Sequence, residues 1–163
     1  MSNTKKFQND LALGQEYEQF LAYEFLKRDY EVEHAPNVKF TDWDLKISKK
    51  GITKTIEVKY QHRTDTGNIA IEYGKVIKGK FIPSGLSTSQ ADILFTKING
   101  LKGWYSLPMS QVQKIIQNKN LYRVASGGDR DSSRMILIPI KDFIKICKLH
   151  GVPQPPINKG LPL

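Results

Sequence analysis

The sequence TDWDLKISKKGITKTIEVKYQ, at residues 41–61, contains two extended segments separated by the turn-forming run SKKG at 48–51. In the second segment apolar residues alternate with Glu57 and Lys59. Because a strand sends successive side chains to opposite faces, these two residues share a face. An antiparallel return through the turn places the beginning of the first segment beside the end of the second. We therefore predict a hairpin in which Asp44 lies close to Glu57 and Lys59.

Two carboxylates and an amine in one place favour a particular chemistry. Converging carboxylates bind a hard divalent cation, and Mg²⁺ is typically held by one or two carboxylates together with waters and phosphate oxygens. A lysine beside such a cation can orient or deprotonate the attacking water, or offset charge that develops on a phosphate. This combination predicts phosphodiester hydrolysis. The alternative is a solvated strand face that carries a Glu and a Lys, with an unrelated Asp in a turn.

The order Asp44, then Glu57-Val58-Lys59 at the end of the following strand, resembles the D…ExK signature of the PD-(D/E)XK nucleases, which share the restriction-endonuclease-like fold. Trp43 stands where the name of the family implies a proline. The resemblance implies an α/β protein with a mixed central β-sheet flanked by helices. It also implies that Asp44, Glu57 and the carbonyl of Val58 hold Mg²⁺, for which Mn²⁺ can substitute, and that Lys59 activates water.

Upstream of the hairpin, apolar residues recur at a helical period and predict an amphipathic helix from Leu11 to about Arg28. Within it, GQEYE at 14–18 followed by a leucine resembles the G-x-x-x-E opening of archaeal-type Holliday junction resolvases, which belong to the same superfamily. The resemblance makes Glu18 an additional catalytic acid. Glu16 borders the same apolar stripe and stays open for that role, and a solvated helix-face glutamate is the third interpretation.

Downstream of the hairpin, Gln61 continues the face of Glu57 and Lys59. It is a candidate to bind a phosphate oxygen or a metal-bound water, or else a plain exposed strand residue. The polar run that follows is a predicted loop, and its Arg63 is a candidate DNA contact because loops in that position meet substrate. In the next predicted strand, Glu72 is either a further acid near the site or an exposed residue.

The segment GKVIKGKFIPSG at 74–85 is rich in glycine and basic residues. We interpret it as a flexible loop or short hairpin in which Lys75, Lys78 and Lys80 touch a phosphate backbone, since lysines give sequence-independent, salt-sensitive attraction. Phe81 is placed to wedge or stack against a base. The alternative is an ordinary solvated loop.

The rest of the chain predicts a single nuclease domain over 1–151 and a proline-rich, extended tail over 152–163. Residues 1–10 are predicted to be frayed. Cys147 is predicted to be a small core residue, because its neighbours are apolar. After Pro108 we expect a short helix whose beginning is a capping box of Ser110 and Gln113. Other predicted elements are strands at 92–98, 103–107, 121–125 and 135–140, a mobile loop at 126–134 and a helix at 141–150.

Composition supports a nucleic-acid partner. The chain has 163 residues, long enough for one domain, and 25 Lys and Arg against 16 Asp and Glu give a formal net charge of +9. Such an excess favours a polyanion, most simply nucleic acid, although anionic membrane surfaces or solubility alone would also fit. No apolar run approaches the length of a membrane span and the first residues lack a signal sequence, so we expect a cytoplasmic protein that does not enter membranes.

The leading hypothesis is a Mg²⁺-dependent DNA endonuclease. Within that class the resemblance favours a branch-specific enzyme of DNA recombination, similar to a Holliday junction resolvase, and implies a homodimer because two symmetric cuts need two sites. A restriction-type, nicking or exonucleolytic DNase of the same superfamily is close behind. A non-catalytic nucleic-acid-binding protein and an RNA nuclease remain as further alternatives.

Overall fold

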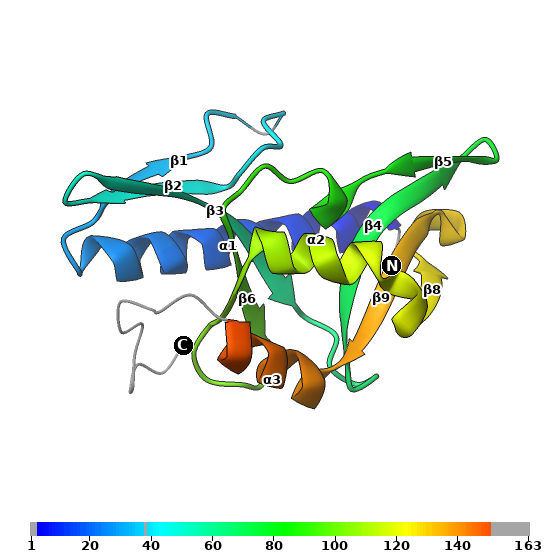
Figure 1. The fold of residues 1–163 in the computed structure, drawn as a ribbon. Helices are drawn as coiled ribbons and strands as arrows, with labels where there is room; N and C mark the ends of the chain where they lie inside the picture. Colours follow the sequence, from blue (N-terminus) through cyan, green and yellow to red (C-terminus); the bar gives the residue numbers. More distant parts are fainter. Residues whose placement is uncertain (1–2, 38, 151–163) are drawn as a thin grey trace.

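The computed structural model describes residues 3–37 and 39–150. The strands in these residues pair into two β-sheets flanked by α-helices (Figure 1). The elements are α1 (Asn3–Leu26), β1 (Glu31–His34), β2 (Leu45–Lys49), β3 (Ile52–Gln61), β4 (Asn68–Ile77), β5 (Lys80–Pro83), β6 (Ile93–Ile98), β7 (Tyr105–Pro108), α2 (Met109–Gln117), β8 (Arg123–Gly127), β9 (Ser133–Pro139) and α3 (Ile140–His150).

The first sheet has the strand order β1-β2-β3-β6-β7. It is mixed, because β3 and β6 run parallel while its other neighbours are antiparallel. The predicted α/β class with a mixed central sheet flanked by helices is therefore confirmed. The predicted hairpin is β2 and β3, with Leu45 paired to Ile56. Its turn is shorter than predicted, since Lys50 and Gly51 have φ angles of 51° and 76°, as in a two-residue type I′ turn.

The two faces of this sheet contribute to separate cores. On one face α1 packs against β2, β3 and β6, in a core made of Leu21, Ala22, Phe25, Leu45, Ile47, Ile56, Ile93 and Phe95. On the other face lie α2, α3 and the second sheet. Glu57 is paired with Leu94, which belongs to this second core. Because neighbouring residues of paired strands share a face, Glu57 and Lys59 point toward the second sheet and away from α1.

The second sheet is antiparallel and has the order β5-β4-β9-β8. The sequence predicted the strands at about these places without predicting that they form a sheet of their own. For the segment 74–85 the sequence left a flexible loop or a short hairpin open. The structure shows a hairpin, formed by β4 and β5. Lys78 and Gly79 form its turn with φ angles of 49° and 76°, again the type I′ geometry that twists with the strands.

Two predictions about local order are wrong. Residues 3–10 are helical and begin α1, so the predicted fraying of 1–10 fails for them. No Gly or Pro interrupts the chain there, so nothing in the backbone stops the helix. The predicted loop at 126–134 is too long, because Gly127 and Ser133 already pair across β8 and β9. The predicted tail at 152–163 lies outside the described residues.

The predicted capping box is also wrong. α2 begins at Met109 with Pro108 as its N-cap and without a side-chain capping bond. The side chain of Gln113 donates instead to the carbonyl of Leu86, at 2.9 Å, and so ties α2 to the segment before β6. The side chain of Gln113, which the predicted capping box would have used, is therefore bound to a residue distant in the chain. Cys147 is buried in the second core, as predicted, and burial raises the pKa of its thiol to about 12.

No helix in the described part of the chain is long and apolar enough to cross a membrane.

Candidate active site

Asp44 lies where the β2–β3 hairpin opens. Its N–H donates to the carbonyl of Ile56 at 2.9 Å, and its Oδ2 accepts a hydrogen bond from the N–H of Val58 at 2.7 Å. One step beyond the Leu45–Ile56 pair, the register sets Asp44 opposite Glu57. The predicted approach of Asp44 to Glu57 is confirmed. Burial raises the pKa of Asp44, against the Val58 hydrogen bond, which lowers it.

Glu57 is the one acid on β3. Its Oε2 accepts a hydrogen bond from the hydroxyl of Ser89 at 2.9 Å. Burial and the carboxylate of Asp44 raise the pKa of Glu57 to about 7, although the Ser89 hydrogen bond and the ammonium of Lys59 lower it. The carboxylate of Glu18 adds a smaller upward contribution. Glu57 is therefore held among like charges in a partly buried position.

Glu18 reaches this cluster from α1. Burial and the carboxylate of Asp44 raise the pKa of Glu18 to about 7, which places the two acids within electrostatic range of each other. Beside it, the ring of Tyr17 stacks on that of Tyr60, with centroids 4.0 Å apart, and so fixes this part of α1 on the end of β3. Glu16 is exposed. Of the two glutamates that the sequence left open, Glu18 is the one that faces Asp44.

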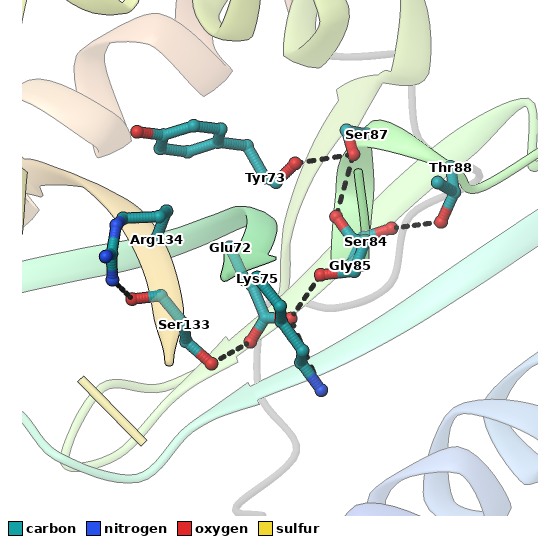
Figure 2. A network of polar contacts seen from close by, with 9 residues as sticks. All are labelled: Glu72, Tyr73, Lys75, Ser84, Gly85, Ser87, Thr88, Ser133 and Arg134. Atoms are coloured by element: carbon teal, nitrogen blue, oxygen red, sulfur yellow. Dashed lines mark hydrogen bonds and ion pairs between the residues drawn. The ribbon is translucent and has the colours of Figure 1, made fainter. Parts of the chain in front are cut away.

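Lys59 lies within electrostatic range of two acids, Glu57 and Glu72. Burial lowers the pKa of its ammonium, while the carboxylates of Glu72 and Glu57 raise it. Glu72 is partly buried and accepts hydrogen bonds from the hydroxyl of Ser84 at 2.9 Å and from that of Ser133 at 3.1 Å (Figure 2). Its Oε1 also lies 3.8 Å from the ammonium of Lys75. The interpretation of Glu72 as an exposed strand residue is therefore wrong, and its charge faces Lys59.

Gln61 and Arg63 lie at the far end of β3 with partners of their own. Gln61 is only 9% exposed, so the interpretation of a plain exposed strand residue is wrong. Its Nε2 donates to the carbonyl of Arg63 at 2.7 Å, and its Oε1 accepts from the N–H of Ala70 at 3.2 Å. These bonds join β3 to β4, and the catalytic role predicted for Gln61 stays a prediction. The guanidinium of Arg63 is exposed and forms an ion pair with Asp65 at 3.2 Å.

The three lysines predicted to bind DNA lie on the β4–β5 hairpin. Lys75 is on β4, Lys78 is in the turn and Lys80 begins β5, and all three are exposed. None of them belongs to the carboxylate cluster. Glu18, Asp44 and Glu57 lie within electrostatic range of one another, and Lys59 lies within range of Glu57 and Glu72. Glu72 connects the two regions, since it lies on the same strand as Lys75.

The fold has counterparts among solved structures. The chain is similar to the bacterial homing endonuclease I-Ssp6803I, with 17% sequence identity and a TM-score of 0.52 over 77% of this chain and 75% of that one. This chain has a restriction-endonuclease-like fold. The Holliday junction resolvase Hjc of the archaeal hyperthermophile Archaeoglobus fulgidus also matches, with 12% identity and a TM-score of 0.42 over 81% of this chain and 95% of that one. The chain matches no family model and no curated protein.

Within this restriction-endonuclease-like fold, Trp43 occupies the position before the aspartate. It packs against the second core, and the ammonium of Lys46 lies 5.0 Å from the centroid of its ring. Trp43 therefore has a packing role beside strand β2, which carries Lys46.

The oxygen donors of the fold suit a divalent cation. Among the residues that the structure describes, no three His, Cys, Asp or Glu side chains are grouped closely enough to form a metal site of their own. Asp44 and Glu57 nevertheless supply two carboxylates, and the carbonyl of Val58 points to the same side of β3 as the N–H that Asp44 binds. Two carboxylates and a carbonyl are the ligands that Mg²⁺ takes with waters. Burial raises the pKa of both acids, and the charge of Asp44 adds to the rise for Glu57, so a bound cation would favour their ionised forms.

Sequence reasoning missed Ser89. It is buried, its hydroxyl donates to Glu57, and the N–H of Ala91 donates to that hydroxyl at 3.3 Å. The serine precedes β6, which pairs with β3 only in the folded chain, so the sequence holds no local signal for the contact. Its position indicates that it orients one oxygen of Glu57 and leaves the other toward Asp44 and Lys59.

Ser89→Ala is expected to slow cleavage about ten-fold, because a hydrogen bond to a charged group contributes roughly 1.5–3 kcal/mol. Without the hydroxyl, Glu57 also holds its proton more tightly, so the loss should be larger at pH 6 than at pH 8. Initial cleavage rates at both values of pH measure the effect. Ser87→Ala is the matched control, since the Ser87 hydroxyl donates to the carbonyls of Tyr73 and Ser84. Equal losses of rate in the two variants would contradict the role of Ser89 in orienting Glu57.

Proposed function

We propose that this protein is a metal-dependent endonuclease that hydrolyses phosphodiester bonds in DNA. The observation that carries the proposal is the convergence of Glu18, Asp44 and Glu57 beside Lys59, on elements of a restriction-endonuclease-like fold. Acids that repel one another cost folding free energy, so their grouping at the open end of a hairpin favours a functional site. A solvated strand face would not hold them in partly buried positions.

Each residue has a role in this proposal. Asp44, Glu57 and the carbonyl of Val58 would hold Mg²⁺, or Mn²⁺ in its place, which supplies a nucleophilic water at neutral pH and charge stabilisation on the phosphate. Lys59 orients or deprotonates the attacking water, a role helped by the burial that lowers its pKa. Glu18 faces the same cluster and completes its negative charge.

The substrate proposed is DNA, because the formal net charge of +9 and the exposed lysines of the β4–β5 hairpin favour a polyanion. The G-x-x-x-E helix that contains Glu18 favours branched DNA, on which a homodimer would make paired cuts. A duplex-specific or nicking enzyme uses the same chemistry, so the form of DNA is decided by the substrate test below.

The test is cleavage of labelled four-way junction, duplex and single-stranded DNA by the purified protein, in Mg²⁺ and in EDTA. Lys59→Ala is expected to lose at least about 100-fold in rate. Lys54→Ala is the matched control, since Lys54 lies exposed on the same strand and is expected to leave the rate unchanged.

Paired, symmetric, Mg²⁺-dependent cuts confined to the junction would support a dimeric resolvase-like enzyme, and the molar mass on DNA should then be that of a dimer. Cutting of plain duplex or single strands would support the proposed active site and would show that the substrate is not branched DNA. Tight binding with no cleavage of any substrate in Mg²⁺ or Mn²⁺ disproves the proposal and leaves a non-catalytic DNA-binding protein. A ribose requirement would be detected by repeating the assay on the matching RNA strands.

A further inference from the structure

The β4–β5 hairpin extends beyond the rest of its sheet as a two-stranded ribbon. Figure 1 shows it projecting past the neighbouring strands to a tight tip. β9 accompanies β4 as far as Lys75, and the N–H of Val76 donates to the carbonyl of Ser132 at 2.8 Å. From Ile77 to the turn, β4 pairs only with β5 among the described residues. The tip is therefore free of the body while its stem is anchored.

One face of the ribbon mixes basic and apolar side chains. The register pairs Lys75 with Ile82 and Ile77 with Lys80, and directly paired residues share a face. Ile77 is 49% exposed and Ile82 is 45% exposed, and both lysines are exposed as well. We call these four residues the ribbon face. It carries two positive charges and two isoleucines in a diagonal pattern, and Glu72 borders it at the stem, with its Oε1 3.8 Å from the ammonium of Lys75.

The opposite face stiffens the ribbon. Phe81 lies over Gly74 so closely that a Cβ built on the glycine would be 2.2 Å from its ring, and its ring centroid is 5.9 Å from that of Tyr73. Phe81 thus packs on its own stem while 51% of it stays exposed, and its stacking against a base stays a prediction. The type I′ turn at the tip shortens the loop to two residues. The ribbon face is presented on a rigid support.

We propose that the ribbon face lies in a groove of duplex DNA and reads base sequence on one side of the cut. This inference rests on the proposed function and names duplex DNA, or a duplex arm of a branched DNA, as the partner. A two-stranded β-ribbon fits the major groove, which is about 12 Å wide. Lys75 and Lys80 bind phosphates, and the methyl groups of Ile77 and Ile82 contact base edges such as the thymine methyl.

The spacing from the site fits this placement. Glu72 faces Lys59, and Ile77 lies five positions further along the same strand. At about 3.3 Å per strand residue, the ribbon face extends from roughly 10 Å to roughly 17 Å from Glu72, which corresponds to about three to five base pairs of duplex. The expected preference therefore concerns base pairs about three to five steps from the scissile phosphate.

Charge favours DNA over other occupants of this face. A second copy of the chain would bring lysines against lysines, which is unfavourable between paired strands. A membrane surface would be met by only two isoleucines, too little apolar area for stable insertion. A polyanion with apolar patches between its phosphates satisfies both kinds of side chain.

The experiment measures binding in EDTA, so that no cleavage is needed. Three double variants are compared with the wild type by fluorescence anisotropy on a duplex of random sequence, from about 50 to 200 mM salt. They are Lys75→Gln with Lys80→Gln, Ile77→Thr with Ile82→Thr, and the control pair Lys141→Gln with Lys145→Gln on the exposed side of α3. Threonine keeps the β-branched shape, and circular dichroism and thermal melting check the fold.

The ribbon lysine pair is expected to reduce the slope of log K against log salt by about 2, and the control pair should leave it unchanged. The isoleucine pair should keep the slope but lose the enrichment of particular sequences from a random duplex pool. Ribbon lysine variants that bind like the control pair, or isoleucine variants that enrich the wild-type sequences, overturn the inference. A wild type that enriches no sequence, or that binds anionic vesicles and not DNA, overturns it too.

The outcome is separable from that of the proposed function. Binding in EDTA that depends on the ribbon face, without cleavage in Mg²⁺, would disprove the nuclease activity and support the DNA-binding role of the ribbon face. Cleavage in Mg²⁺ that depends on Lys59, with binding unaffected by both ribbon pairs, would support the nuclease activity and disprove the role of the ribbon face.

Discussion

Asp44→Asn is expected to slow DNA cleavage by at least about 1000-fold and to leave DNA binding in EDTA within about two-fold of the wild type. The asparagine can still accept the hydrogen bond from the N–H of Val58, so the opening of the β2–β3 hairpin should keep its shape. What is lost is the negative charge next to Glu57 and Glu18. Single-turnover cleavage and anisotropy on the same labelled DNA measure the two properties.

Asp92→Asn is the matched control for this prediction. The carboxylate of Asp92 also accepts hydrogen bonds from β3, from the N–H of Thr55 at 2.8 Å and from its hydroxyl at 3.1 Å. Asp92, like Asp44, is a carboxylate that accepts a main-chain hydrogen bond from β3. Its partner Thr55 is not one of the proposed site residues. Cleavage should survive Asp92→Asn. If Asp44→Asn cleaves as fast as the wild type, Asp44 has no part in the mechanism.

Glu57→Gln is expected to stabilise the metal-free protein at pH 8 by up to about 3 kcal/mol and to leave its stability near pH 4 unchanged. The pKa of Glu57 is raised from 4.5 to about 7 in the folded protein, mainly by burial and by Asp44. A group with a raised pKa contributes stability that is fully present below the unfolded value and is lost as pH rises through the folded value. Glutamine carries no charge and therefore escapes this loss, and it can still accept from Ser89.

Denaturant unfolding in EDTA at pH 4 and pH 8 measures the effect. Glu33→Gln is the control, because Glu33 is an exposed acid whose ion pair with Lys46 contributes little. Saturating Mg²⁺ at pH 8 should then stabilise the wild type and not Glu57→Gln, since a ligand that binds only the folded state adds to its stability. A variant that is less stable than the wild type at pH 8 would show that Glu57 is not held among repelling charges.

The hairpin and the acids on it were predictable because their signals are local. Alternation along residues 52–61 fixes which side chains share a face, and a short turn fixes the register, so the meeting of Asp44 with Glu57 follows from neighbouring residues. The helical period of α1 also placed Glu18 at the edge of a buried stripe. Periodicity alone left Glu16 open; in the folded chain Tyr17 stacks on Tyr60, and Glu18 is the glutamate within electrostatic range of Asp44.

The remaining contacts of the site depend on pairings that no local pattern encodes. Ser89 reaches Glu57 only because β6 runs parallel to β3. Glu72 faces Lys59 only because β4 leaves the first sheet and pairs with β9, where Ser133 donates to it. The amide of Gln61 binds the main chain on both sides, contacts that its place in the alternation did not indicate, and its catalytic role stays a prediction. Outside the β2–β3 hairpin, the sequence indicated where strands lie but not which of them are neighbours.

The pairing of β4 with β9 also sets the order in which the protein can acquire its structure during synthesis. It joins residues as far apart as Asn68 and Pro139, and such distant contacts form slowly, whereas the β2–β3 hairpin closes over a two-residue turn. Ser133 lies 61 positions after Glu72 in the chain, so Glu72 cannot receive the hydroxyl of Ser133 until β9 has left the ribosome. A nascent chain therefore carries the hairpin acids long before Lys59 has its surroundings, and we expect it to be inert toward DNA until β9 docks.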